Sequence, residues 1–166
     1  MLLDVSPILD QSGSTLPFEV SLDLSELTFG GCRTDAPVKA AGTVRNTAGV
    51  FVLSGELQSV LRGVCDRCAK ELVREIRFPL HAILSARPQD DGEEDPWSFP
   101  LENNQADLDE IVTTAFVLSM EPKFLCREDC KGLCPRCGKD LNDGPCDCRP
   151  EPDPRFAVLS QLLKNS

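Results

Sequence analysis

The sequence lacks long apolar runs, and its N-terminus lacks a basic region followed by an apolar one. The longest apolar stretches, such as residues 49–53, span only a few residues, whereas a membrane-spanning helix needs roughly 20. We therefore expect no membrane contact, no signal peptide and a cytoplasmic location. Apolar residues still make up 41% of the 166 residues, which is enough for a folded core.

Basic charge is also scarce. The chain has 17 Lys and Arg against 27 Asp and Glu, for a net charge of -10, which argues against a nonspecific nucleic-acid binder. The acidic excess is concentrated in residues 79–121, with a net charge of -9. Residues 60–78 and 122–166 instead carry small positive excesses of +2 and +1.

The apolar pattern predicts an α+β fold built on an antiparallel β-meander. Alternation in residues 16–27 indicates a strand or short helix. Residues 38–61 read as a meander with a turn at 45–49. Residues 72–84 form a further strand, in which Pro79 predicts an edge or a bulge.

One amphipathic helix is expected over residues 107–120, with Asp107 as its N-cap and Glu110 three residues later. We expect a β-rich core over residues 1–121, which also contains an acidic linker at 87–96. A cysteine-rich, zinc-binding tail follows over residues 122–166 and ends in a short helix.

Nine cysteines are many for this length, and their odd number suits metal binding better than a disulfide framework. Thiolates that flank a tight CxxC turn can reach the same ion. The candidate metal ligands are Cys65, Cys68, Cys126, Cys130, Cys134, Cys137, Cys146 and Cys148. The ninth cysteine, Cys32, is expected to be a small core residue or a free thiol.

Eight thiolates would fill two closed sites of four ligands each, and we favour two structural zinc ions. One site would be local to Cys134, Cys137, Cys146 and Cys148, and the other would join Cys65 and Cys68 to Cys126 and Cys130. The alternative is a single site made by Cys65, Cys68, Cys134 and Cys137. An iron–sulfur cluster also uses four cysteines, and the sequence does not exclude it.

The metal is expected to be structural, and the protein is not expected to be an enzyme. A closed all-thiolate site leaves no coordination position for a substrate, so no small-molecule substrate is expected. The single histidine, His81, lies in a strand candidate far from the cysteines. No thioredoxin-like βαβ pattern surrounds Cys65.

Cationic side chains accompany both cysteine-rich stretches, and two interpretations compete for them. They either neutralise thiolate charge or form a face that contacts phosphates or a protein partner. The candidate RNA- or partner-binding residues are Arg62, Arg67, Lys70, Lys131, Arg136 and Lys139.

The order of these features resembles the YceD family, the large ribosomal RNA subunit accumulation proteins of bacteria and plastids. The resemblance covers residues 15–163. It rests on the Cys65–Cys68 motif, the helix that starts at Asp107 and ends before Pro122, the CKGLCPRCGKDLN stretch at 130–142 and the Cys146–Cys148 pair. The resemblance implies a part in 23S rRNA accumulation and large-subunit assembly, and it carries over no catalytic residue.

The leading hypothesis is therefore a non-enzymatic assembly factor that binds 23S rRNA, its precursor or a large-subunit ribosomal protein. One alternative is a metal-dependent nuclease that processes rRNA, with magnesium held by carboxylates in 90–95 and by Asp107, Asp109 and Glu110. The other is an adaptor for a large-subunit ribosomal protein, which would use Trp97, Phe99 and the acidic linker.

Overall fold

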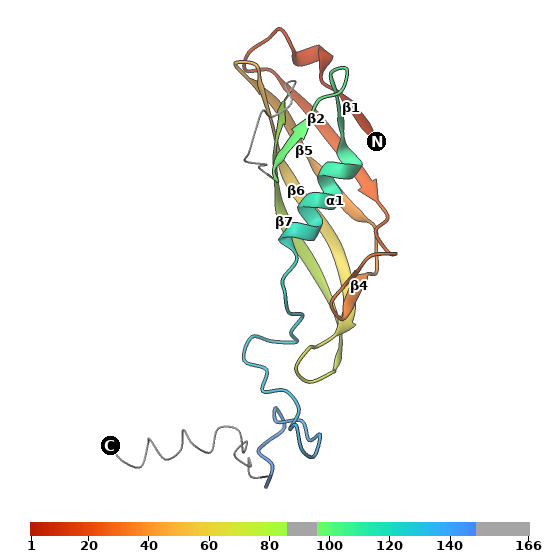
Figure 1. The fold of residues 1–166 in the computed structure, drawn as a ribbon, viewed down its shortest axis with the longest axis vertical. Helices are drawn as coiled ribbons and strands as arrows, with labels where there is room; N and C mark the ends of the chain where they lie inside the picture. Colours follow the sequence, from red (N-terminus) through yellow and green to blue (C-terminus); the bar gives the residue numbers. More distant parts are fainter. Residues whose placement is uncertain (86–95, 149–166) are drawn as a thin grey trace, which may run out of the picture.

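The computed structural model describes residues 1–85 and 96–148. A seven-stranded, mainly antiparallel sheet carries helix α1 on one face, and the cysteine-rich tail extends from one end of the sheet (Figure 1). The α+β class with one helix is confirmed. The predicted acidic linker falls almost wholly outside the described residues, and the predicted C-terminal helix falls wholly outside them.

The sheet order is β2-β5-β6-β4-β3, with β7 on the other side of β6 and β8 parallel to the end of β7. A second, two-stranded sheet pairs β1 with β9. The elements are β1 (Leu2–Asp4), a 3-10 helix η1 (Ser6–Ile8), β2 (Thr15–Leu22), β3 (Thr28–Phe29), β4 (Cys32–Thr34), β5 (Val38–Thr47), β6 (Val50–Val64), β7 (Glu71–Ser85), β8 (Ser98–Pro100), β9 (Gln105–Asp107) and α1 (Leu108–Ser119).

Strands β6 and β7 form the long axis of the molecule. They pair without interruption from Phe51 opposite Leu84 to Val64 opposite Glu71. The loop that joins them, residues 65–70, therefore lies at the far end of the sheet, and this loop carries the first CxxC motif (Figure 1).

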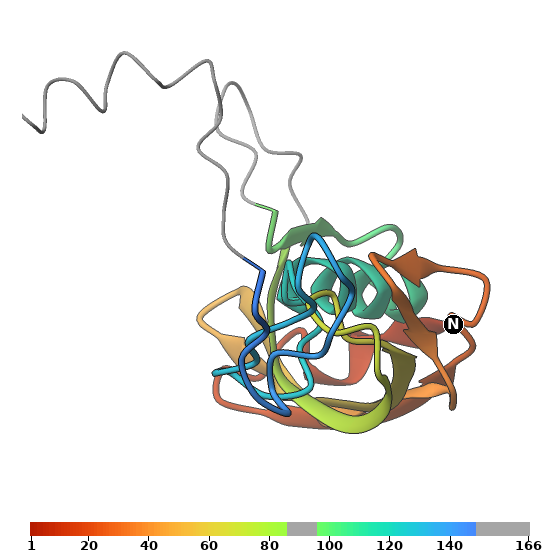
Figure 2. The same ribbon diagram turned by 90° about the horizontal axis from the view of Figure 1, so that it is seen from below.

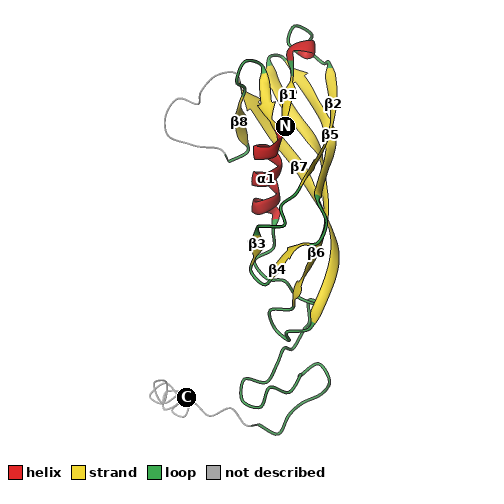
Figure 3. Cartoon of the chain, turned by 90° about the vertical axis from the view of Figure 1, so that its right-hand side faces the viewer, coloured by secondary structure: helices red, strands yellow, loops and turns green. Residues whose placement is uncertain are grey.

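Alternation along the strands gives the sheet one apolar face, and α1 covers it. Figure 2, viewed from the end with the tail, shows the sheet curving around the side on which α1 lies. Phe116 of α1 is fully buried and packs edge-on against Phe29 and Phe78, with ring centroids 5.4 and 6.3 Å away. None of the described elements covers the opposite face (Figure 3).

The helix begins as predicted. The Asp107 side chain caps it by accepting a hydrogen bond from the backbone N–H of Asp109 at 2.9 Å. Pro79 is accommodated because it lies on an edge. The backbone N–H of Ile83 points away from β6 and donates to Trp97, so Pro79, which has the same parity, directs its missing N–H to that edge. The register there is continuous, so no bulge forms.

Candidate metal centres

Both CxxC motifs lie in an eight-residue unit that occurs twice in the chain. The first CxxC turn is Val64–Glu71, with the sequence VCDRCAKE, and the second CxxC turn is Leu133–Asp140, with the sequence LCPRCGKD. In each unit an apolar residue, Cys, Arg, Cys, a small residue, Lys and an acidic residue stand at the same positions. Sequence reasoning noted the two motifs but missed this wider repeat.

The two turns share the same hydrogen bonds. The end residues of each unit pair as antiparallel β-bridges. Inside the first turn, Cys65 N–H donates to the Lys70 carbonyl at 2.9 Å, and in the second, Cys134 N–H donates to the Lys139 carbonyl at 2.8 Å. The small residue then donates back to the first cysteine of its turn, at 2.8 and 2.9 Å. The repeat in sequence is therefore also a repeat in backbone structure.

The eight candidate ligands gather in two groups, as the two-ion arrangement requires. The first cysteine group is Cys65, Cys68, Cys126 and Cys130, and the second cysteine group is Cys134, Cys137, Cys146 and Cys148; within each, the sulfurs lie within 4.8 Å of one another. The single-site combination of the two CxxC pairs does not occur among these groups.

The sulfur spacing in the first cysteine group suits one tetrahedral ion. The Cys65 and Cys130 sulfurs are 3.8 Å apart, and the Cys68 and Cys126 sulfurs are 3.6 Å apart. Four sulfurs that each lie roughly 2.3 Å from a single ion are roughly 3.8 Å apart at the corners of a tetrahedron. A disulfide would bring two sulfurs to roughly 2.0 Å. The four thiolates of an iron–sulfur cluster are distributed over two or four iron atoms, so some of their sulfurs would stand further apart than the 4.8 Å that bounds this group.

Main-chain hydrogen bonds at Cys65 and Cys134 favour the thiolate form, which is the form that binds metals. Main-chain donors, led by the N–H of Cys137, lower the pKa of Cys134 to about 6. Burial raises the pKa of Cys65, but main-chain donors led by Cys126 outweigh it and bring that pKa to about 6. The adjacent Cys137 sulfur raises the pKa of Cys148 to about 12. A dication would offset this repulsion between crowded sulfurs.

The tail is held against the first CxxC turn by backbone contacts. Asp66 and Phe124 exchange two bonds: the Asp66 N–H donates to the Phe124 carbonyl at 2.9 Å, and the Phe124 N–H donates to the Asp66 carboxylate at 2.6 Å. Further along the tail, Leu133 N–H donates to the Arg67 carbonyl at 2.9 Å. The tail therefore lies along the β6–β7 loop before the second turn begins.

Arg74 of β7 reinforces this junction. Arg74 has the same parity as the apolar Leu72 and Ile76 of β7, and its guanidinium lies 4.8 Å from the centre of the Phe124 ring. Its Nη2 also contacts Glu121 at 3.1 Å. Arg74 thus links the sheet to the segment that runs from α1 to the first cysteine group.

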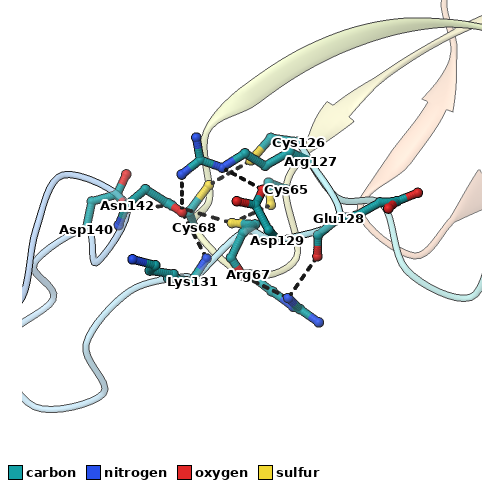
Figure 4. A network of polar contacts seen from close by, with 11 residues as sticks. Cys65, Arg67, Cys68, Cys126, Arg127, Glu128, Asp129, Lys131, Asp140 and Asn142 are labelled. Carbon is teal, nitrogen blue, oxygen red and sulfur yellow. Dashed lines mark hydrogen bonds and ion pairs between the residues drawn. The ribbon is translucent and has the colours of Figure 1, made fainter.

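Asn142 and Asp140 support the first cysteine group, and sequence reasoning missed both (Figure 4). The Asn142 side-chain amide donates to the Cys130 sulfur at 3.5 Å, and its oxygen accepts from Lys131 N–H at 2.9 Å. Asp140 accepts from Asn142 at 2.7 Å and pairs with Lys70 at 2.7 Å. Lys70 lowers the pKa of Asp140 to about 2. The Asp-x-Asn spacing, which allows a local turn, is the only sequence signal for this pair.

Most of the candidate RNA- or partner-binding cations already make contacts inside the protein. The contacts are Arg62 with Asp35 at 2.8 Å, Arg67 with the Cys130 carbonyl at 2.8 Å, Lys70 with Asp140 at 2.7 Å and Lys139 with the Pro145 carbonyl at 2.7 Å. Lys131 and Arg136 lie exposed. Two of these contacts, those of Arg67 and Lys70, join the first CxxC turn to the tail.

Other singled-out residues lie apart from the cysteine groups. Cys32 is a buried core residue whose thiol donates to the Phe29 carbonyl at 3.0 Å. His81 is exposed on β7. Phe99 is buried in β8, and Trp97 beside it is partly buried against the core.

The comparison with known families decides the affiliation of the chain. A family model described as "Large ribosomal RNA subunit accumulation protein YceD" matches residues 53–163, more than half of the chain, and this span contains both CxxC turns. The chain belongs to the YceD family. The match extends from within β6 through all eight clustered cysteines.

Relatives within and near the YceD family are distant. The chain is 24% identical over 178 residues to the large ribosomal RNA subunit accumulation protein YCED homolog 1, chloroplastic, of Arabidopsis thaliana, covering 90% of this chain and 54% of that protein. It is 29% identical over 118 residues to an uncharacterized protein of Mycobacterium tuberculosis, covering 69% of this chain and 56% of that protein. The chain thus spans little more than half the length of these relatives.

No solved structure matches the chain. Within the described residues, no helix has both the length and the apolar character that crossing a membrane requires.

Proposed function

We propose that this YceD-family chain is a non-enzymatic ribosome biogenesis factor that supports 23S rRNA accumulation. The observation that carries the proposal is the family match, because its description names the accumulation of large-subunit ribosomal RNA and its span covers both cysteine groups. The proposed partners are 23S rRNA, its precursor or a large-subunit ribosomal protein, in the cytoplasm.

We propose zinc as the metal of both cysteine groups. Four thiolates around one tetrahedral position are a typical zinc donor set, and the sulfur distances of 3.6 and 3.8 Å support a single ion in the first group. Zinc bound there would supply coordination bonds and no open position for a substrate. The chain's own residues orient the ligands, since Asn142 donates to the Cys130 sulfur.

Two of the three described carboxylates of the nuclease alternative, Asp107 and Asp109, have structural roles, which supports a factor without catalysis. Asp107 caps α1, and Asp109 accepts from the N-terminal amine of Met1. We further propose that residues 1–121 act as the core and that residues 122–166 act as a tail whose order depends on the metal.

Metal analysis of the purified chain tests the first part of the proposal. We expect two zinc ions per chain. The double variant with Cys134→Ser and Cys137→Ser should retain one ion. Cys32→Ser is the matched control, because Cys32 lies outside both groups, and it should keep both ions. Iron in place of zinc, or disulfides in freshly isolated protein, would contradict the zinc assignment.

The functional part is tested in a host whose own family member is deleted. We expect the wild-type chain to restore the ratio of 23S to 16S rRNA, the Cys65→Ser variant to fail, and Cys32→Ser to restore it. Crosslinking in the same cells should enrich 23S rRNA or large-subunit proteins. An unchanged rRNA ratio after deletion, together with no such enrichment, would remove the proposal.

A further inference from the structure

The short loop that the second cysteine group closes reaches back to the first cysteine group. Residues 138–145 lie between Cys137 and Cys146, which both belong to the second group. Asn142 lies inside this loop, and its side-chain amide donates to the sulfur of Cys130, a member of the first group, at 3.5 Å (Figure 4). One loop is therefore part of both sites.

Asn142 also fixes the chain around Cys130. Its side-chain oxygen accepts from the Lys131 N–H at 2.9 Å and from the Arg127 guanidinium at 2.7 Å. Both donors lie in the segment that supplies Cys126 and Cys130 to the first group. One amide side chain thus contacts the Cys130 sulfur, the main chain that follows it and the side chain next to Cys126.

The neighbours of Asn142 strengthen the connection. The Asp140 carboxylate accepts from the Asn142 main-chain N–H at 2.9 Å and from its side-chain amide at 2.7 Å, and it pairs with Lys70 of the first CxxC turn at 2.7 Å. The Leu141 N–H donates to the Gly132 carbonyl at 2.9 Å. Asp140, Leu141 and Asn142 therefore form a linking segment between the two sites.

The position of the linking segment depends on the second cysteine group. The segment follows Cys137 and precedes Cys146, and an ion bound by both cysteines would fix the two ends of the loop that contains it. Closing a loop lowers the conformational entropy that is lost when its middle takes up one position. Binding at one site that orders a segment shared with another site strengthens binding at the other.

We propose that the two cysteine groups bind their metal ions cooperatively, because an ion in the second group orders the linking segment, which then holds Asn142 against Cys130. Asn142 is a positioning residue of the first site. Linkage requires that an ion in the first group strengthens binding at the second by the same factor. This inference rests on the proposed function, since it assumes that both groups hold zinc. It adds a regulatory property, because the tail would undock over a narrow range of free zinc concentration.

The test uses the full chain labelled with 15N, while a chelator lowers free zinc stepwise. Backbone amide signals of each CxxC turn report on the ion of that turn's own group. In the double variant with Cys134→Ser and Cys137→Ser, we expect the first group to lose its ion at about tenfold higher free zinc than in the wild type. Asn142→Ala should cause about the same shift. Asn103→Ala, at an exposed asparagine in the turn before β9, should cause none.

Combining the changes decides whether Asn142 carries the coupling. If it acts through the second ion, adding Asn142→Ala to the double variant should weaken the first group by less than about twofold further. The reverse effect is measured in a variant with Cys65→Ser and Cys68→Ser, whose second group should lose its ion at about tenfold higher free zinc. Additive losses, or a first group that ignores the loss of the second ion, overturn the inference.

The zinc content of the wild-type chain is measured at saturating zinc before the titration. Fewer than two ions per chain would overturn the proposed metal sites and the inference with them. Two ions that leave independently would overturn only the inference. The amide signals of β6 and β7 should be unchanged in every variant, because the main core is a cluster separate from the cysteines.

Discussion

The two CxxC turns have the same fold but complete their metal sites differently. The first turn closes a long hairpin and takes its other ligands, Cys126 and Cys130, from a segment that follows α1. The second turn takes Cys146 and Cys148 from the next few residues. Cys65 and Cys130 are each 2% exposed, whereas Cys137 is exposed.

This difference shows that one local unit can serve two purposes. A site whose ligands are distant in sequence closes a long loop and ties two parts of the fold together, whereas a site with adjacent ligands orders only its own loop. The first cysteine group is therefore expected to fix the tail to the sheet. The second is expected to keep a small surface rigid.

Removing one ligand from each group should separate these purposes most strongly. We expect Cys65→Ser to release the tail from the sheet, so that residues 122–132 lose hydrogen-exchange protection by more than about 4 kcal/mol, while the second cysteine group keeps its own loop protected. Cys134→Ser should expose residues 133–148 to exchange but leave the contact between Asp66 and Phe124 protected. In both variants β6 and β7 should stay protected, because the main core forms a cluster separate from the cysteines.

Zinc content checks the same pair of variants, since each should lose one ion. If Cys65→Ser kept the tail protected, the first group would not be the link between tail and sheet. If Cys134→Ser opened the whole tail, the two sites would act as one unit.

Gly132 lies where the tail crosses the first CxxC turn, and its substitution should have the next largest effect. It has φ +75°, and an added Cβ would be 2.8 Å from the Arg67 carbonyl oxygen. We expect Gly132→Ala to weaken tail protection by about 2–3 kcal/mol. Gly138→Ala is the matched control, since φ is +72° there with nothing within 4 Å of the added atom. Equal losses would mean that the close approach to Arg67 contributes nothing.

Arg67 should contribute less than Gly132, because its side chain is exposed. Its guanidinium nevertheless donates to the Cys130 carbonyl at 2.8 Å, and hydrogen bonds from charged donors contribute about 1.5–3 kcal/mol when they are well shielded. We expect Arg67→Ala to lower protection of the tail by about 1–2 kcal/mol, measured by hydrogen exchange. Arg45→Ala in β5 should leave the protection of the tail unchanged. If Arg67→Ala also left it unchanged, main-chain contacts alone would hold the tail against the first CxxC turn.

The strands and the helix followed from local physics and could be predicted from sequence. Alternation in β7 placed Leu80, Ala82 and Leu84 on the buried face, and Asp107 marked the start of α1. The spacing of the cysteines favoured two groups of four over a single site made by the two CxxC pairs, and the structure brings the sulfurs together in these two groups. Extents were less certain: the predicted meander stops at residue 61, whereas β6 runs from Val50 to Val64.

The missed features depend on residues that are far apart in sequence. In the sequence Lys70 is indistinguishable from a solvent-exposed cation, but in the fold it lies 2.7 Å from Asp140. Arg74 is a charged residue at an otherwise apolar position of its strand, and only the fold places it over the Phe124 ring. The strands β1 and β9 are only three residues each and pair although Leu2 and its partner Asp107 are far apart in sequence. Such short segments have no periodicity long enough to identify.

The smallest expected effect concerns the position at which both turns adopt a left-handed backbone but carry different residues, Ala69 and Gly138. Ala69 has φ 56° and Gly138 has φ 72°, so both positions lie in the left-handed region that disfavours side chains. Gly138→Ala should destabilise the second turn by about 1 kcal/mol. Ala69→Gly should change the first by no more than about 0.5 kcal/mol, because relief of strain is offset by the greater freedom of glycine in the unfolded chain. Hydrogen exchange of the two turns measures both, and a large gain from Ala69→Gly would mean that the first turn tolerates strain because the docked tail holds it in place.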